Sequence, residues 1–196
     1  YTFGDGFDFK PDGSVFYVND RGSGYLYAHR MLTPWDLSTA VFRGDTYYMT
    51  LQDGDARDIS FSPDGRKIAL GIYNEGIYVL DSKTREVLNE INNNNFAVET
   101  LSFSIDGLQL FCGLKKEPNT KNTKSELEIF NLENNELIKT LDPIKGYSSF
   151  WKILMSPDGS KFITIRDHNE IKIWDSISYE LLESHKLDFY PISGEI

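Results

Sequence analysis

Short runs in which apolar and polar residues alternate recur along the whole chain, and they predict β-strands. The clearest pair is Asp58–Ser62 and Lys67–Ile72, which flank Pro63-Asp64-Gly65 and are typical of a hairpin. Two further alternating runs follow, at Gly76–Asp81 and Glu86–Ile91. The pattern therefore predicts a unit of four antiparallel strands, with almost no helix.

The same unit occurs four times. Its turn reads FKPDG at Phe9–Gly13, FSPDG at Phe61–Gly65, FSIDG at Phe103–Gly107 and MSPDG at Met155–Gly159. The four glycines, Gly13, Gly65, Gly107 and Gly159, follow one another at intervals of 52, 42 and 52 residues. In such a turn the Asp side chain bonds nearby backbone and the Gly takes a positive φ. A repeat of this length with four strands per unit is typical of a β-propeller blade.

We therefore predict an all-β chain that forms one β-propeller domain over residues 1–196. The four blades are expected at about 3–52, 53–95, 96–143 and 144–187, and they act as one unit because a blade cannot bury its own faces. A row of four blades leaves sheet faces and edges uncovered at its ends. The chain closes as a four-bladed ring, pairs with a second copy, or forms part of a larger propeller.

Two units depart from the regular pattern. In the first, a connection over residues 31–48 separates the third strand from a fourth strand expected near Tyr47–Leu51. In the third, the polar insertion Lys115–Glu126 is expected to form an exposed loop. Trp35 and Trp174 are expected to pack between blades.

Composition excludes some partners and compartments. The net charge is −10, which argues against nucleic acid and against an anionic membrane surface. No apolar run approaches the roughly 18 residues of a membrane-spanning helix. No signal peptide begins the chain as given, and the single Cys112 rules out an internal disulfide framework, so a cytoplasmic location is favoured.

The third strand of the last unit ends in Trp174-Asp175, and degenerate versions stand at Leu80-Asp81 and Phe130-Asn131. With the PDG hairpins, these residues resemble the WD-repeat propeller family. The resemblance implies that Asp167, in the turn before the third strand, supports its blade through hydrogen bonds. Asn74 replaces this Asp in the second unit, and the Gly-His dipeptide of the family is missing.

A second resemblance covers about a quarter of the chain. The run Tyr25–Leu70, with its Trp35-Asp36-Leu37-Ser38-Thr39-Ala40 segment beside a PDG hairpin, looks like propeller repeats of phage tail and bacterial surface proteins. It implies a virion or surface structure as the alternative location.

Residues just before the innermost strands are expected to ring the mouth of the central channel. Aligned on the repeat, they are Asp5, Arg57, Glu99 and Trp151 at one position, and Gly6, Asp58, Thr100 and Lys152 at the next. These positions vary in charge and size between units, which favours a recognition surface, with Arg57 and Trp151 as anchors. The alternative is that they are solvated loop residues.

No catalytic constellation is evident. The three histidines, His29, His168 and His185, fall in no metal-binding spacing, and Cys112 lies in an apolar strand. The acidic run Asp53–Asp58 lacks the spacing of a calcium loop and is interpreted as a solvated turn. We expect no cofactor and no metal.

Three functional hypotheses follow. The first is a non-enzymatic scaffold that binds a protein partner through the propeller face. The second is a virion or cell-surface component that recognises a host receptor or a glycan. The third is a propeller enzyme of the lactonase or lyase type, which needs acidic and amide ligands that the innermost strands here do not present.

Overall fold

The computed structural model describes residues 6–20, 25–48, 56–73, 75–92, 96–118, 120–145 and 148–187. The side chains of residues 20, 43–48 and 168 are not described. Within these ranges the chain forms four antiparallel sheets of four strands each, arranged as a four-blade β-propeller, and the predicted fold class is confirmed. No helix in these ranges is long and apolar enough to cross a membrane.

In every sheet the strands pair in chain order. Sheet 1 holds β1 Phe7–Phe9, β2 Val15–Asp20, β3 Tyr25–Met31 and β4 Ala40–Tyr48. Sheet 2 holds β5 Ala56–Phe61, β6 Lys67–Ile72, β7 Gly76–Asp81 and β8 Val87–Asn92. Sheet 3 holds β9 Phe96–Phe103, β10 Gln109–Lys116, β11 Lys124–Asn131 and β12 Leu137–Lys145. Sheet 4 holds β13 Phe150–Met155, β14 Lys161–Arg166, β15 Glu170–Asp175 and β16 Leu181–Lys186.

The PDG turns have the geometry that their residues dictate. Gly13, Gly65, Gly107 and Gly159 have φ values of +68°, +69°, +69° and +71°. In sheet 2, Asp64 accepts hydrogen bonds from the Arg66 backbone N–H, at 3.0 Å, and from the Ser62 hydroxyl, at 2.6 Å. The short turn and its Asp bonds set the register of each hairpin.

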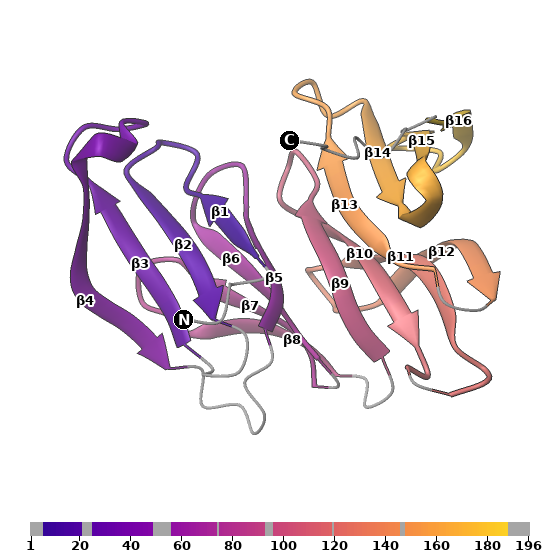
Figure 1. The fold of residues 1–196 in the computed structure, drawn as a ribbon, viewed down its shortest axis with the longest axis horizontal. Coiled ribbons are helices and arrows are strands. Elements are labelled where there is room, and N and C mark those ends of the chain that lie inside the picture. The colour runs from indigo at the N-terminus through magenta and orange to yellow at the C-terminus, as the bar shows by residue number, and fades with distance from the viewer. Residues whose placement is uncertain are drawn as a thin grey trace, which may run out of the picture.

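Consecutive sheets pack face to face. Figure 1 shows them as a row from β1–β4 on the left to β13–β16 at the upper right. We call the face that meets the preceding sheet the leading face, and the face that meets the following sheet the trailing face. In sheet 2 the leading face carries Ile68, Leu70, Tyr78 and Leu80, and the trailing face carries Ala69, Ile77 and Val79. All seven side chains are buried because both faces are covered.

The same alternation builds the interface between sheets 3 and 4. We call such an interface between the faces of two consecutive sheets a joint. Phe111, Leu127 and Ile129 on the trailing face of sheet 3 meet Phe162 and Trp174 on the leading face of sheet 4. The rings of Phe162 and Trp174 stack at 5.9 Å, and the Trp174 indole N–H donates to the Thr164 hydroxyl at 3.1 Å. Trp174 therefore packs between blades as predicted. Asp175 beside it accepts from the backbone N–H groups of the following turn.

Three local expectations are wrong. β4 begins at Ala40 rather than near Tyr47, because Val41 and Phe42 already pair with Arg30 and His29 of β3. Trp35 does not lie between two sheets of the described chain: it is 61% exposed, and its ring centre lies 5.5 Å from that of Phe9, on which it stacks.

The third expectation concerns the insertion in the third unit. β10 and β11 extend into it, so the connection shrinks to residues 117–123. Ser125 and Glu126, expected in an exposed loop, are buried on β11. The two strands extend because Lys115 and Lys116 pair in register with Ser125 and Lys124.

Two glycines with nearly equal φ values allow backbone strain to be separated from crowding. Among the described residues, a Cβ on Gly107 would meet only Ser62, at 3.8 Å, whereas a Cβ on Gly159 would overlap the side chain of Ile105 in the preceding PDG turn. We predict that Gly107→Ala lowers the free energy of unfolding by about 1 kcal/mol through its φ alone. Gly159→Ala should lower it by about 1–3 kcal/mol more.

Urea unfolding followed by tryptophan fluorescence measures both variants. Equal losses at the two positions would contradict the packing of the fourth PDG turn on the third.

Candidate functional site

The innermost strands β1, β5, β9 and β13 are the edge strands of their sheets. Alternate backbone N–H groups on an edge strand point away from the sheet and have no partner within it, and leaving them buried and unpaired is costly. Here carboxylates of the preceding sheet accept them. Asp8 Oδ2 accepts from Phe61 N–H at 2.7 Å, Asp58 Oδ2 from Leu101 N–H at 2.8 Å, and Glu99 Oε2 from Phe150 N–H at 2.9 Å.

Asp58 is the most deeply placed of these carboxylates, with 5% of its surface exposed. Burial raises its pKa, and the Lys152 ammonium, 3.4 Å away on β13, opposes the rise. This ion pair joins sheet 2 to sheet 4 across the axis. Thr100, beside Asp58 in the predicted set, is fully buried as well. Both side chains are therefore buried in contacts between blades and do not face solvent.

Arg57, Glu99 and Trp151 share a feature that the sequence did not show: each is the extra residue of a β-bulge. In β5, Ala56 pairs with Ile72 and Asp58 with Gly71, so Arg57 has no opposite residue. The register of β9 skips Glu99 and that of β13 skips Trp151 in the same way. A bulge turns its side chain out of the regular alternation, often toward a functional rim.

Each bulge residue contacts a residue at the end of the second strand of its own sheet or directly after it, and the chemistry differs each time. The Arg57 guanidinium lies over the Tyr73 ring, 4.7 Å from its centre. Glu99 Oε1 forms an ion pair with Lys115 Nζ at 2.8 Å. The Trp151 indole N–H donates to Asp167 Oδ1 at 2.6 Å. We call these contacts the bulge pairs and the ends of the strands that carry them the bulge side.

Asp167 also holds the segment that precedes β13. Its Oδ2 accepts from Ser149 N–H at 2.7 Å, and its own N–H donates to the Ser149 carbonyl at 3.0 Å. The segment before β13 is thereby fixed to the short 3-10 helix η2, Asp167–Asn169. Trp151 is held in place by a residue whose own position is fixed.

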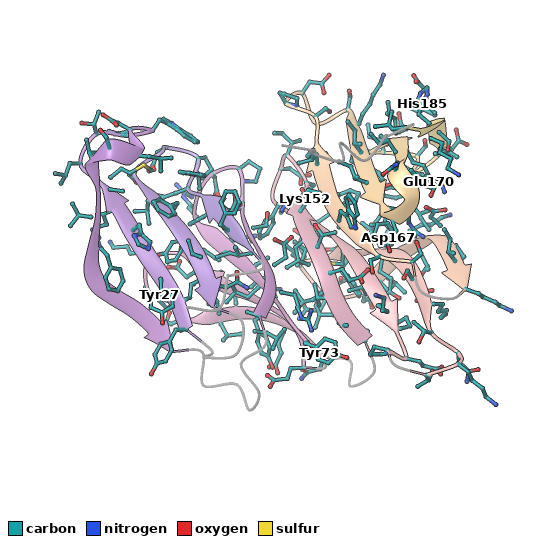
Figure 2. The ribbon with its side chains drawn as sticks, viewed as in Figure 1. Tyr27, Tyr73, Lys152, Asp167, Glu170 and His185 are labelled. Atoms are coloured by element: carbon teal, nitrogen blue, oxygen red, sulfur yellow. The ribbon has the colours of Figure 1, made fainter. Side chains whose placement is uncertain are left out.

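A cavity of about 360 Å³ lies beside the Trp151–Asp167 pair on the bulge side, between sheets 3 and 4. Its ionisable lining residues are Lys145, Asp167, Glu170, His185 and Lys186. Figure 2 shows Asp167, Glu170 and His185 on sheet 4, and Tyr73 at the lower edge of the molecule. A second cavity, lined by Lys10, Arg30, Lys83 and Arg85 among others, lies on the opposite side at the PDG turns and contacts none of the bulge pairs.

The predicted residues thus divide into two groups. Asp58, Glu99 and Thr100 lie among contacts between sheets, while Trp151 is 60% exposed and Lys152 is half-buried beside Asp58. Gly6 is buried, and its N–H donates to Asn19 Oδ1 at 2.6 Å. Asp5, Asn74 and residues 53–55 lie outside the described residues. Alignment of the four repeats predicted the three bulge positions as candidates, but only the strand pairing in the structure shows that they are β-bulges.

Chemistry at other candidates is limited in the described part of the chain. Cys112 is fully buried, and burial raises its pKa well above its ordinary value. His29 lies in sheet 1 and His185 in sheet 4, and no group of three His, Cys, Asp or Glu residues within these ranges could hold a metal ion. Comparison with known proteins finds no matching family model and no matching curated protein.

The raised pKa of Asp58 predicts a pH dependence. A carboxyl whose pKa is higher in the folded state binds more protons when folded, so its contribution to stability falls as pH rises through that pKa. Asp58→Asn removes this titration and keeps an oxygen acceptor for Leu101 N–H. We expect the stability of the wild type relative to Asp58→Asn to increase as pH falls from 7 and to level off below about 4.

Urea unfolding curves of both proteins between pH 3.5 and 7 measure the difference. A constant difference, or one that shrinks as pH falls, would show that the Lys152 pair outweighs burial at Asp58.

Proposed function

We propose that this protein is a non-enzymatic binding module whose bulge side holds a segment of a protein partner. The fold is one that commonly serves as an interaction scaffold. The observation that carries the proposal is the state of Trp151, which is 60% exposed and yet fixed by its 2.6 Å hydrogen bond to Asp167. An exposed aromatic side chain that is already ordered loses little entropy on binding.

The surroundings of Trp151 support a peptide segment as the ligand. The adjacent cavity is lined by side chains of both charges, which suits a polar or charged side chain of a partner once an apolar one covers the indole. Arg57, stacked on Tyr73, provides a second ordered contact on the same side of the molecule. Tryptophan, tyrosine and arginine are the residues that dominate binding energies at interfaces.

The proposal is tested with a peptide library displayed on phage and selected against the wild-type protein. We expect peptides whose affinity falls roughly 30-fold for Trp151→Ala, which corresponds to about 2 kcal/mol. Trp35→Ala is the matched control, because Trp35 is 61% exposed but lies at the PDG-turn side of sheet 1. Isothermal titration with each variant measures the loss.

Two further variants separate the anchor from its support and from the second contact. Asp167→Asn keeps an acceptor for the Trp151 indole, and Arg57→Ala removes the second contact without touching Trp151. Arg57→Ala should weaken binding and Asp167→Asn should weaken it less than Trp151→Ala. Equal binding of selected peptides to wild type and Trp151→Ala would overturn the proposed site.

A further inference from the structure

The two ends of the row of sheets leave one face uncovered each. Among the described residues, no extensive strand-to-strand packing joins sheet 1 to sheet 4. The leading face of sheet 1 and the trailing face of sheet 4 therefore lack the neighbours that the internal faces have.

On sheet 4 the uncovered face is aliphatic. Ile163, Ile171 and Ile173 occupy the register positions that Ala69, Ile77 and Val79 occupy on the trailing face of sheet 2. The three residues of sheet 2 are fully buried, whereas the three isoleucines are only half-buried. Leu154, which pairs with Ile163, is 46% exposed.

On sheet 1 the uncovered face is mainly aromatic. Phe16, Val18, Tyr27 and His29 occupy the positions of the buried Ile68, Leu70, Tyr78 and Leu80 on the leading face of sheet 2. All four are half-buried. Phe16 stacks on His29 at 4.7 Å, and Phe42, 47% exposed, lies 5.4 Å from His29. Figure 2 marks Tyr27 on this sheet.

The backbone hydrogen bonds at the inner edge of sheet 1 differ from those of sheet 2 in the same way, because no carboxylate of a preceding sheet accepts the equivalent N–H among the described residues. Phe61 N–H on β5 is accepted by Asp8 of the preceding sheet, at 2.7 Å. The equivalent group on β1 is Phe9 N–H, which is accepted by Oδ1 of Asp8 in its own strand, at 2.8 Å. Sheet 1 thus has both the apolar face and the inner edge of a sheet that follows another sheet.

We propose that these two faces bind each other between two copies of this chain. In every internal joint a trailing face packs on a leading face, so the trailing face of sheet 4 and the leading face of sheet 1 are the two halves of one further joint of the same kind. Each copy supplies what the other lacks. Two copies form two identical joints and close an eight-bladed ring, which lies within the range of known propellers.

Mass in solution tests the proposal directly. Size-exclusion chromatography with light scattering at tens of micromolar should give twice the chain mass of 22.5 kDa. Leu154→Glu on the trailing face and Phe42→Glu on the leading face should each give the 22.5 kDa species, since a buried unpaired carboxylate disrupts an apolar joint. Both side chains are exposed within one copy, so the variants should fold as the wild type does.

Ile177→Glu is the matched control, because Ile177 is 85% exposed in a turn outside both faces. It should remain at the wild-type mass. Mixing Leu154→Glu with Phe42→Glu should restore a weaker dimer, because one joint of the pair then contains neither substitution. Circular dichroism and urea unfolding of each variant show that folding is unchanged.

Three outcomes would overturn the proposal. A wild-type monomer at these concentrations shows that the faces are covered by something other than a second copy. Larger polymers show that the joint forms without closing a ring. A dimer that persists in Leu154→Glu and in Phe42→Glu uses another surface. None of these outcomes bears on peptide binding at Trp151, which uses different residues.

Discussion

The structure depends on the satisfaction of backbone N–H groups along the innermost strands. These strands are edges, and a propeller brings its edges together where water is scarce, so each unpaired N–H needs an acceptor. Asp8, Asp58 and Glu99 supply acceptors from the preceding sheet. The apolar faces of consecutive sheets already pack on each other, and these bonds hold the innermost strands of the two sheets together. Lys152 then offsets part of the cost of burying Asp58.

This constraint leaves the bulges as the positions where the repeat can vary. A bulge residue has no cross-strand partner and is therefore not held to one chemistry by the sheet. Arg57, Glu99 and Trp151 each form a different pair with a residue at or just beyond the end of the second strand. In sheet 3 the pair is used between blades, because Glu99 also accepts Phe150 N–H. In sheet 4 it orders an exposed indole beside a cavity, and that difference supports the proposed binding role.

The end sheets follow from the same logic. A repeat protein uses one type of joint throughout, so the first and last repeats present half a joint each unless they are altered into caps. Here the two end faces are little altered, because the isoleucines of sheet 4 and the aromatic residues of sheet 1 keep these faces apolar. A face of this kind is a liability for a single copy and a binding surface for a second one.

The sequence by itself determined the strands, their grouping and the turns between them. Alternation sets which side chains share a face, and the Asp-Gly pair sets a turn that requires positive φ, so both are local properties. The candidate positions Arg57, Glu99 and Trp151 were also found by aligning repeats. Only the tertiary structure decided what those positions do, because their contacts join residues that are not neighbours in the chain. Asp58 reaches Leu101 in sheet 3 and Lys152 in sheet 4, and Trp151 reaches Asp167 within sheet 4. The starting point of β4 and the extension of β10 and β11 were decided in the same way, by pairing with a neighbouring strand. In β10 and β11 this pairing outweighed a polar local sequence.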